Sequence, residues 1–118
     1  MRYLLLIYQD EAARSQWSEE EQAAEYQEYF DFSVESEKQG VSAGAALMPG
    51  NTATTVRVRN GKILTIDGPF AETKEQLGGF YMLNCDNLDE AIEIAAKIPG
   101  ARHGSIEIRP VMEVEGML

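Results

Sequence analysis

The side chain best suited to acid–base chemistry in this sequence is His103, which is the only histidine. An imidazole has an unperturbed pKa near 6.5, so it exchanges protons at neutral pH. Asp67 could orient that ring or hold it charged if the loops that carry the two residues meet. Arg109, Arg57 or Arg59 could fix a carboxylate or enolate oxygen. The pattern indicates proton transfer on a small polar or anionic metabolite; the alternative is a structural hydrogen bond from His103 to the central turn.

The central turn, Asp67-Gly68-Pro69-Phe70, precedes a short polar run. Glycine takes positive φ without steric cost, and proline ends a sheet ladder because it lacks an N–H donor. We expect Phe70 to anchor the turn to a core. Glu72 and Lys74 are candidate ligand-binding residues, since functional groups often lie on loops held by a rigid scaffold. The alternative is a tight connection whose charges are solvated.

Other reactive motifs are absent from the sequence. One histidine with scattered carboxylates does not make a metal site, which needs three or four convergent ligands. Cys85, the only cysteine, lies within a predicted strand without a basic neighbour, so we expect an inert thiol. There is no glycine-rich phosphate loop, serine elbow or cysteine pair. The sequence therefore predicts no metal and no cofactor.

Composition sets the class of protein. The 118 residues are 44% hydrophobic, which fits one domain spanning residues 1–118 with a real core. The formal net charge of -10 argues against nucleic acid and anionic membranes as partners. No apolar run reaches the ~18 residues of a membrane span. A single cysteine suits a reducing cytoplasm, and the apolar start of the chain is expected to be a strand rather than a signal peptide.

The first half of the chain predicts a strand, a helix and a second strand. Residues 2–8 are apolar on both faces, as in a strand covered on both sides. Ser18 is the expected N-cap of a helix that runs to about residue 39 and is ended by Gly40. Glu37 near its last turn either reaches water or lines a pocket. We expect Phe32 to point outward and the inner face to comprise Ala23, Tyr26, Phe30, Ser33 and Val34. Tyr26 on that face is a further candidate ligand-binding residue.

The second half begins with a strand at 41–47 and an Asn60-Gly61 hairpin that joins strands at 52–59 and 62–66. A strand at 80–85, a helix capped by Asn87 or Asp86, and a strand at 105–111 follow. The apolar stripe of that helix is predicted to be Leu88, Ala91, Ile92, Ala95 and Ile98.

This order is the split β-α-β pattern of a ferredoxin-like α+β fold with an antiparallel sheet and a hairpin insert. Two helices on one face of the sheet leave its other apolar face bare. We therefore expect two subunits to pair face to face as a homodimer, which makes a dimeric α+β barrel.

Residues 67–81, DGPFAETKEQLGGFY, are similar to the signature of DGPF-domain proteins, a branch of the YCII-related family. Four other parts of the chain also match this family: the run from Tyr3 to Tyr8, Leu88-Asp89-Glu90-Ala91, Pro99, and the segment from Arg102-His103-Gly104 to Val111. The resemblance implies a dimeric α+β barrel of ferredoxin-like subunits and a function that is mostly uncharacterised.

The resemblance carries hints about chemistry. Some DGPF genes resemble those found beside extracytoplasmic-function sigma factors, which implies a regulatory or stress setting. The wider superfamily includes ring-lactone isomerases, dehydrochlorinases and small monooxygenases. In some YCII-related relatives a His–Asp pair with its histidine on the first helix is proposed as catalytic. Residues 18–39 here contain no histidine, so that pair cannot be carried over, and only His103 is available.

Two functions of different classes follow. The first is a cofactor-free acid–base lyase or isomerase that acts on a metabolite in a pocket between helices and sheet, with His103, Asp67 and Arg109 as its machinery. The second is a non-catalytic ligand-binding or regulatory dimer, with a link to sigma-factor regulation. A domain that only mediates protein contacts would have no small-molecule pocket.

Overall fold

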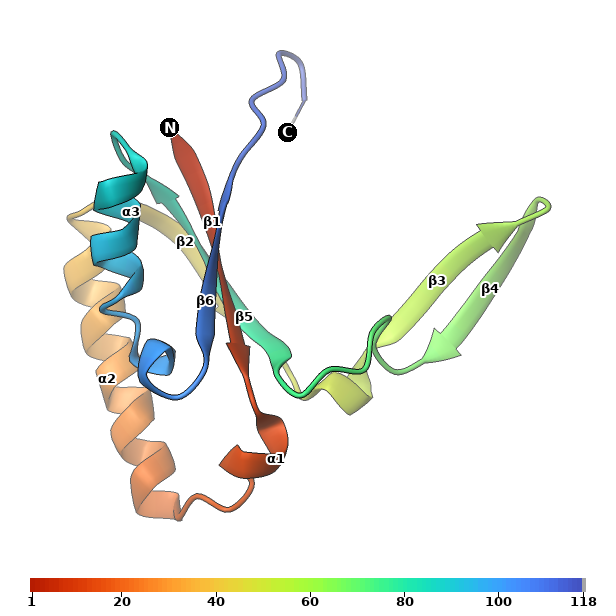
Figure 1. Cartoon of the computed structure of the whole chain (residues 1–118), viewed down its shortest axis with the longest axis horizontal. Helices are drawn as coiled ribbons and strands as arrows, with labels where there is room; N and C mark the ends of the chain where they lie inside the picture. Colours follow the sequence, from red (N-terminus) through yellow and green to blue (C-terminus); the bar gives the residue numbers. More distant parts are fainter. Residues whose placement is uncertain (118) are drawn as a thin grey trace.

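The computed structural model describes residues 1–117, which fold as one α+β unit with a projecting arm (Figure 1). The helices and strands, in chain order, are β1 Arg2–Gln9, α1 Glu11–Arg14, α2 Glu19–Glu37, β2 Val41–Ala46, η1 Gly50–Thr52, β3 Thr54–Arg59, β4 Lys62–Asp67, β5 Gln76–Asn84, α3 Leu88–Ala95, η2 Pro99–Arg102 and β6 Ser105–Pro110. The segment between β1 and the long helix contains the short helix α1.

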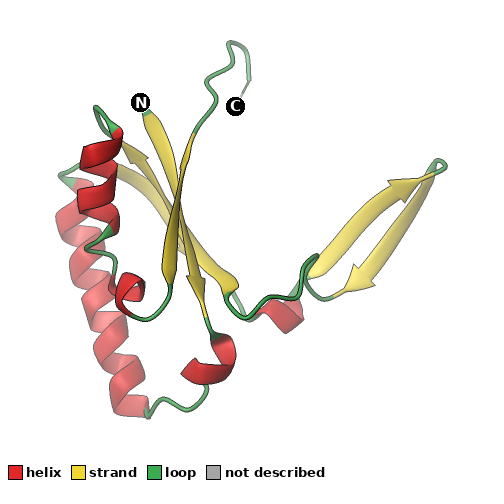
Figure 2. Ribbon diagram, in the orientation of Figure 1, coloured by secondary structure: helices red, strands yellow, loops and turns green. Residues whose placement is uncertain are grey.

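The main sheet has the strand order β2-β5-β1-β6, with antiparallel pairing throughout. This is the order of a ferredoxin-like fold, so the predicted fold is confirmed, including the hairpin inserted between β2 and β5. In Figure 2 the helices α2 and α3 lie on the same side of the sheet. Burial therefore alternates along β1, because its Tyr3, Leu5 and Ile7 are buried against the helices.

The long helix α2 begins as the sequence predicts but turns a different face inward. Ser18 and Glu21 form the capping box, and the helix ends two residues before the predicted end. The buried positions are Glu25, Phe32 and Ser36, with Tyr29 packed between them. The predicted inner face was wrong: Tyr26, Phe30 and Val34 are 71%, 65% and 51% exposed, and Ala23 and Ser33 are also exposed.

The reason is that the helix carries its own aromatic residues on several sides. The spacing of its apolar residues therefore does not show which face is buried. The buried stripe at 25, 29, 32 and 36 has proper helical spacing but includes a glutamate and a serine. A prediction from hydrophobicity alone assigns a stripe with these two polar residues to the exposed face. A carboxylate can nevertheless be buried when a cation pairs with it. Glu37 is exposed, which agrees with the alternative that it reaches water.

The second long element of the helical layer, α3, is capped by Asn87, whose side chain accepts a hydrogen bond from the Glu90 N–H. Ala91, Ala95 and Ile98 are buried as predicted, together with Ile94. The prediction that Leu88 and Ile92 belong to this buried stripe was wrong, since each is 49% exposed. The core is therefore a thin layer between β1, β5 and the inner faces of two helices.

The arm is the hairpin β3–β4, which projects away from the sheet and the helices (Figure 1). Its turn has Asn60 at φ 52° and Gly61 at φ 74°, which confirms the predicted hairpin. The arm is a separate two-stranded sheet, and it raises the radius of gyration to 16.2 Å. A compact chain of this length has about 13.5 Å. Phe70 at its base is 76% exposed, so the predicted anchoring of the central turn by Phe70 was wrong.

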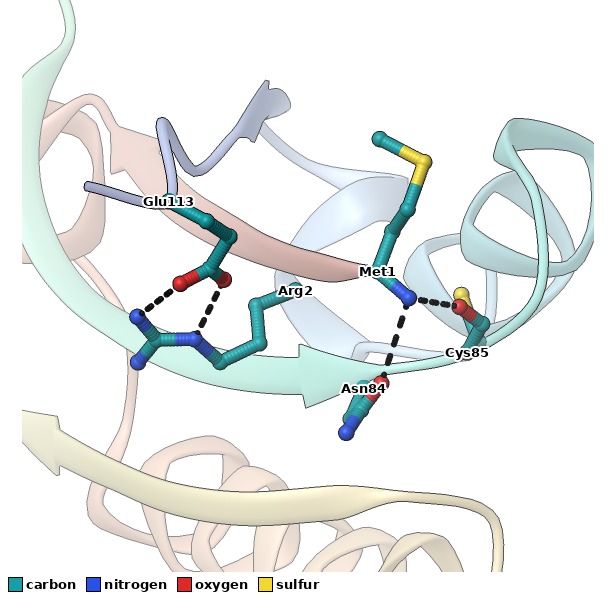
Figure 3. Close-up of polar contacts among 5 residues, drawn as sticks. All are labelled: Met1, Arg2, Asn84, Cys85 and Glu113. Atoms are coloured by element: carbon teal, nitrogen blue, oxygen red, sulfur yellow. Dashed lines mark hydrogen bonds and ion pairs between the residues drawn. The ribbon is translucent and has the colours of Figure 1, made fainter. Parts of the chain in front are cut away.

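Two sets of contacts hold the terminal segments where the central strand β1 begins and β5 ends (Figure 3). The Arg2 guanidinium donates two hydrogen bonds to the Glu113 carboxylate, at 2.7 and 2.8 Å. This contact raises the pKa of Arg2 and lowers the pKa of Glu113. The amine of Met1 donates to the Cys85 carbonyl at 2.9 Å and to Asn84 Oδ1 at 3.4 Å. Among the described residues, no helix is both long and apolar enough to cross a membrane.

The register of α2 gives a direct test with two phenylalanines. Phe32→Ala removes a buried ring that packs on Tyr81, so it should lower the free energy of unfolding by about 3–5 kcal/mol. Phe30→Ala, two residues away on the exposed side, should change it by roughly 0.5 kcal/mol or less. Urea denaturation of both variants measures the difference. Equal losses would contradict the observed register.

Candidate functional site

A cavity of about 880 Å³ lies between the helices and the sheet. We call it the helix–sheet cavity. Its walls come from the end of β1, from α1, from α2 between Gln22 and Ser33, from the end of β2 with the segment that follows it, and from β5 between Gly78 and Tyr81. The volume falls within the ~300–1,000 Å³ typical of small-molecule sites. Most of its surface is apolar, with Ile7, Leu47, Met48 and Pro49 among the lining residues.

The charged group at the cavity is an ion pair that joins α1 to α2. Arg14 Nη1 lies 2.5 Å from Glu25 Oε1, and the Glu25 side chain is only 6% exposed. The Arg14 guanidinium also stacks over the Trp17 ring, 4.6 Å from its centroid. The arginine is therefore held between a carboxylate and an indole. Two residues of this cluster, Arg14 and Glu25, line the cavity.

The second carboxylate oxygen of Glu25 is buried and has no hydrogen-bonding partner among the described residues. A buried polar atom without a partner costs about 1–3 kcal/mol, so such atoms are rare in folded proteins. Glu25 lines the cavity, so this buried oxygen belongs to a side chain of the cavity wall. The wall of the helix–sheet cavity thus contains a hydrogen-bond acceptor that has no donor in the described part of the chain.

One turn further along α2, Tyr29 also lines the cavity. Its hydroxyl oxygen accepts a hydrogen bond from the Gly100 N–H at 3.1 Å, which leaves the hydroxyl proton free to donate. Burial and the nearby Glu25 charge raise the pKa of Tyr29 to about 12, so the hydroxyl stays protonated at neutral pH. Ser33, another turn on, lies 3.2 Å from the Tyr81 hydroxyl. Residues 25, 29 and 33 therefore form a polar stripe along the cavity wall.

Small residues form the sheet side of the cavity. Gly44 pairs with Tyr81 across the strands, and a Cβ at position 44 would lie 2.5 Å from the Tyr81 ring. A Cβ on Gly79 would lie 2.8 Å from the Ala45 carbonyl oxygen. Side chains at these two positions would collide with the neighbouring strand or ring. Ala45 and Ala46 continue this wall of small residues.

The structure places the two predicted catalytic residues apart. His103 is exposed and follows η2, where its ring packs edge-on against Trp17 with 5.0 Å between centroids. Asp67 ends β4 at the base of the arm. No contact joins them among the described residues, and neither lines the helix–sheet cavity. Their pairing stays a prediction. His103 does touch the cluster around Arg14 through the indole of Trp17.

The other predicted residues are scattered. Arg109 is exposed on β6 and lies 3.5 Å from Glu107. Arg57 is on the arm, where its guanidinium lies 5.4 Å from the Phe70 ring centroid. Lys74 is exposed in the loop before β5, and Glu72 lines a smaller cavity of about 420 Å³ between that loop, α1 and η1. Of the predicted ligand-binding residues, Tyr26 alone lines the helix–sheet cavity.

Sequence reasoning missed Arg14, Glu25 and Tyr29. A signal for the first pair was present: an arginine precedes a capped helix whose second turn carries Glu25 in the same stripe as Tyr29 and Phe32. The stripe becomes visible only if a buried charge is allowed. Among residues 1–117, no group of three or more His, Cys, Asp or Glu side chains is placed to hold a metal ion.

Comparison with known proteins gives the family. The model of the YCII-related domain matches residues 1–115. The chain belongs to the YCII-related family. An uncharacterized protein of Rhizobium meliloti (strain 1021) is 42% identical over 118 aligned residues, which cover 94% of this chain and 92% of that protein. This YCII-related chain thus matches its relative over nearly the full length of both, and the relative carries no assigned activity.

The raised pKa of Tyr29 is a measurable property of the cavity. The folded chain holds the phenol proton to about pH 12, whereas an unfolded chain releases it near pH 10. Stability from the protonated ring is therefore complete below pH 10 and is lost as the pH rises from about 10 to about 12. Tyrosinate absorbance should show one tyrosine titrating near 12 that disappears in Tyr29→Phe.

Glu25→Gln should lower the pKa of Tyr29, because the glutamate charge is one of its two main causes. The value should stay above that of an ordinary tyrosine, since burial is the larger cause. Glu37→Gln, an exposed glutamate on the same helix, is the control and should leave it unchanged. An unchanged pKa in Glu25→Gln would show that the carboxylate does not face Tyr29.

Proposed function

We propose that this YCII-related protein binds a small metabolite in the helix–sheet cavity. The observation that carries the proposal is the buried Glu25 oxygen without a donor at the wall of an apolar volume of about 880 Å³. A protein interior rarely leaves an acceptor unpaired, so an incoming donor gains a hydrogen bond that folding alone does not supply. Aromatic and aliphatic walls supply the burial that a small ligand needs.

A second candidate is acid–base catalysis in the same cavity. The observation that favours it is the pairing of a carboxylate acceptor at Glu25 with a protonated phenol at Tyr29, one helical turn apart. A lyase or isomerase needs one group to take a proton and another to support the oxygen that gains charge. Binding without turnover is the alternative, and it suits a regulatory dimer. Turnover assays on any ligand found decide between the two.

The binding proposal predicts that filling the cavity abolishes ligand-induced stabilisation. Ala46 pairs with Gly79, which in turn pairs with the buried Ile7, so its side chain is on the helix side of the sheet. Ala46→Trp should place an indole in the cavity. In a thermal-shift screen of metabolites, a ligand at a hundred times its Kd should stabilise the wild type by roughly 2.7 kcal/mol and leave Ala46→Trp unshifted.

The matched control is Ala24→Trp, an exposed alanine of α2 outside the cavity wall. It should respond to the ligand as the wild type does. A ligand that still stabilises Ala46→Trp binds elsewhere, and that result would reject the helix–sheet cavity as its site.

We also propose that the functional form is a homodimer. The face of the sheet turned away from the helices carries Leu4, Leu6 and Tyr8 of β1, with Phe80 and Met82 beside them on β5. The same face of β6 carries Glu107 and Arg109, opposite Leu6 and Leu4. A second copy related by a two-fold axis matches this surface, because each subunit offers an apolar centre and both signs of charge at its edge.

The molar mass of the protein in solution tests the dimer proposal. Light scattering at micromolar concentration should give twice the chain mass of 13.1 kDa for the wild type. Leu6→Arg places a charge at the centre of the proposed interface and should give the single-chain mass. Leu88→Arg, on the exposed side of α3, should leave the dimer intact. A wild type that scatters as a monomer would end this proposal.

A further inference from the structure

We propose that the ligand of the helix–sheet cavity is an uncharged planar molecule that donates an O–H or N–H to Glu25 and accepts one from Tyr29. This inference rests on the proposed binding function and adds the class of ligand. It follows from three features of the cavity: its balance of charge, its free hydrogen-bonding atoms and the shape of its walls.

The charge balance disfavours anions. The charged residues that line the cavity are Glu11, Arg14 and Glu25. Arg14 is already paired with Glu25, and the Glu11 carboxylate accepts the Gly50 N–H at 2.9 Å. An anionic ligand would therefore find no free cation among these residues and would meet a net negative charge. Desolvating its charge there would not be repaid.

Cations are disfavoured for a different reason. The free Glu25 oxygen belongs to the same carboxylate that lies 2.5 Å from Arg14. A ligand ammonium bound to that oxygen would lie within a few ångströms of the guanidinium, on the order of 4 Å, where like charges repel strongly at low dielectric. A neutral hydroxyl or amide donor gains a charge-assisted hydrogen bond without this repulsion.

The second free atom is the Tyr29 hydroxyl proton. Its oxygen is occupied by the Gly100 N–H, so the hydroxyl can still donate to an acceptor in the cavity. Residues 25 and 29 are one helical turn apart, so their side chains begin roughly 6 Å apart along one wall. A ligand that uses both must carry a donor and an acceptor at a similar separation.

The walls favour a flat molecule. On the sheet side Gly44 and Gly79 have no side chains, and the Tyr81 ring packs directly over Gly44. On the helix side Tyr26 and Tyr29 add two more rings. Aromatic faces stack on planar ligands with geometry and energy that saturated rings do not match. A ring with polar groups at two positions fits both the walls and the two free atoms.

Four matched probes test the inference: 3-hydroxybenzamide, methyl benzoate, 3-hydroxybenzoate and 3-hydroxybenzylamine. The first is neutral and carries both a donor and an acceptor; methyl benzoate is neutral and planar but has no O–H or N–H donor, and the last two bear a negative and a positive charge. NMR titration of the full chain, followed at the backbone amides of Gly44, Gly78 and Gly79, measures each Kd at the cavity. We expect 3-hydroxybenzamide to bind about tenfold more tightly than each of the other three.

Glu25→Gln gives a readout that a merely structural role would not produce. The substitution removes the charged acceptor and leaves Arg14 without its partner. The preference should then reverse, so that 3-hydroxybenzoate gains about tenfold and 3-hydroxybenzamide loses about tenfold. Glu37→Gln should keep the wild-type order. If circular dichroism shows that Glu25→Gln does not fold, the order of the four probes on the wild type is decisive by itself.

The outcomes separate this inference from the binding proposal. If 3-hydroxybenzoate or 3-hydroxybenzylamine binds the wild-type cavity as tightly as the neutral probe, the inference is overturned and the cavity remains a binding site. The same holds if no probe binds but a charged metabolite gives a thermal shift that Ala46→Trp abolishes. If neither the probes nor any metabolite responds to Ala46→Trp, both proposals fall.

Discussion

The contact on which the site depends is the ion pair between Arg14 and Glu25. It joins the four-residue helix α1 to the long helix α2, and the Trp17 ring covers its other side. Helix α1 is too short to be stable alone, so its position is set by this pair, by the Asp10 cap and by the hydrogen bonds of Glu11 with Gly50 and Gln76. Because α1 forms one wall of the helix–sheet cavity, the pair both builds the cavity and leaves one buried carboxylate oxygen of the cavity-lining Glu25 unpaired among the described residues.

A buried ion pair rarely adds stability relative to an apolar pair of the same size. Position 25 could hold a leucine and continue the apolar stripe that ends at Phe32, and α1 could then pack by burial alone. A charged pair at this point, with one carboxylate oxygen unpaired among the described residues, is more easily understood as a binding feature than as a device for folding. The same physical reasoning explains Tyr29, whose hydroxyl is held by the Gly100 N–H while its proton stays available.

The fold could be predicted from the sequence because its signals are local and agree with each other. Each of four local signals specifies one element: the apolar residues on both faces of β1, the Ser18 capping box, the Asn87 cap and the Asn60-Gly61 turn. The order of these elements along the chain is compatible with few topologies. The face of α2 could not be predicted in this way. Its buried stripe contains Glu25 and Ser36, and the reason that these residues can be buried lies in Arg14 and in the adjoining elements. The residues of the helix–sheet cavity were missed for the same reason, because the cavity is formed by tertiary packing. His103 and Asp67 were chosen by residue type, and their pairing stays a prediction.

The two sides of the sheet have separate roles under these proposals, and this separation makes them compatible. The helix–sheet cavity uses the side of β5 that carries Gly79 and Tyr81, whereas the apolar face proposed for the dimer uses Phe80 and Met82, the residues that alternate with them. A second copy on that face would not fill the cavity. It would instead fix the sheet that forms the cavity floor, since β5 contributes to both sides. The exposed arm fits the same arrangement, because an isolated two-stranded hairpin with Val56, Val58 and Ile63 exposed gains little stability until another surface covers it.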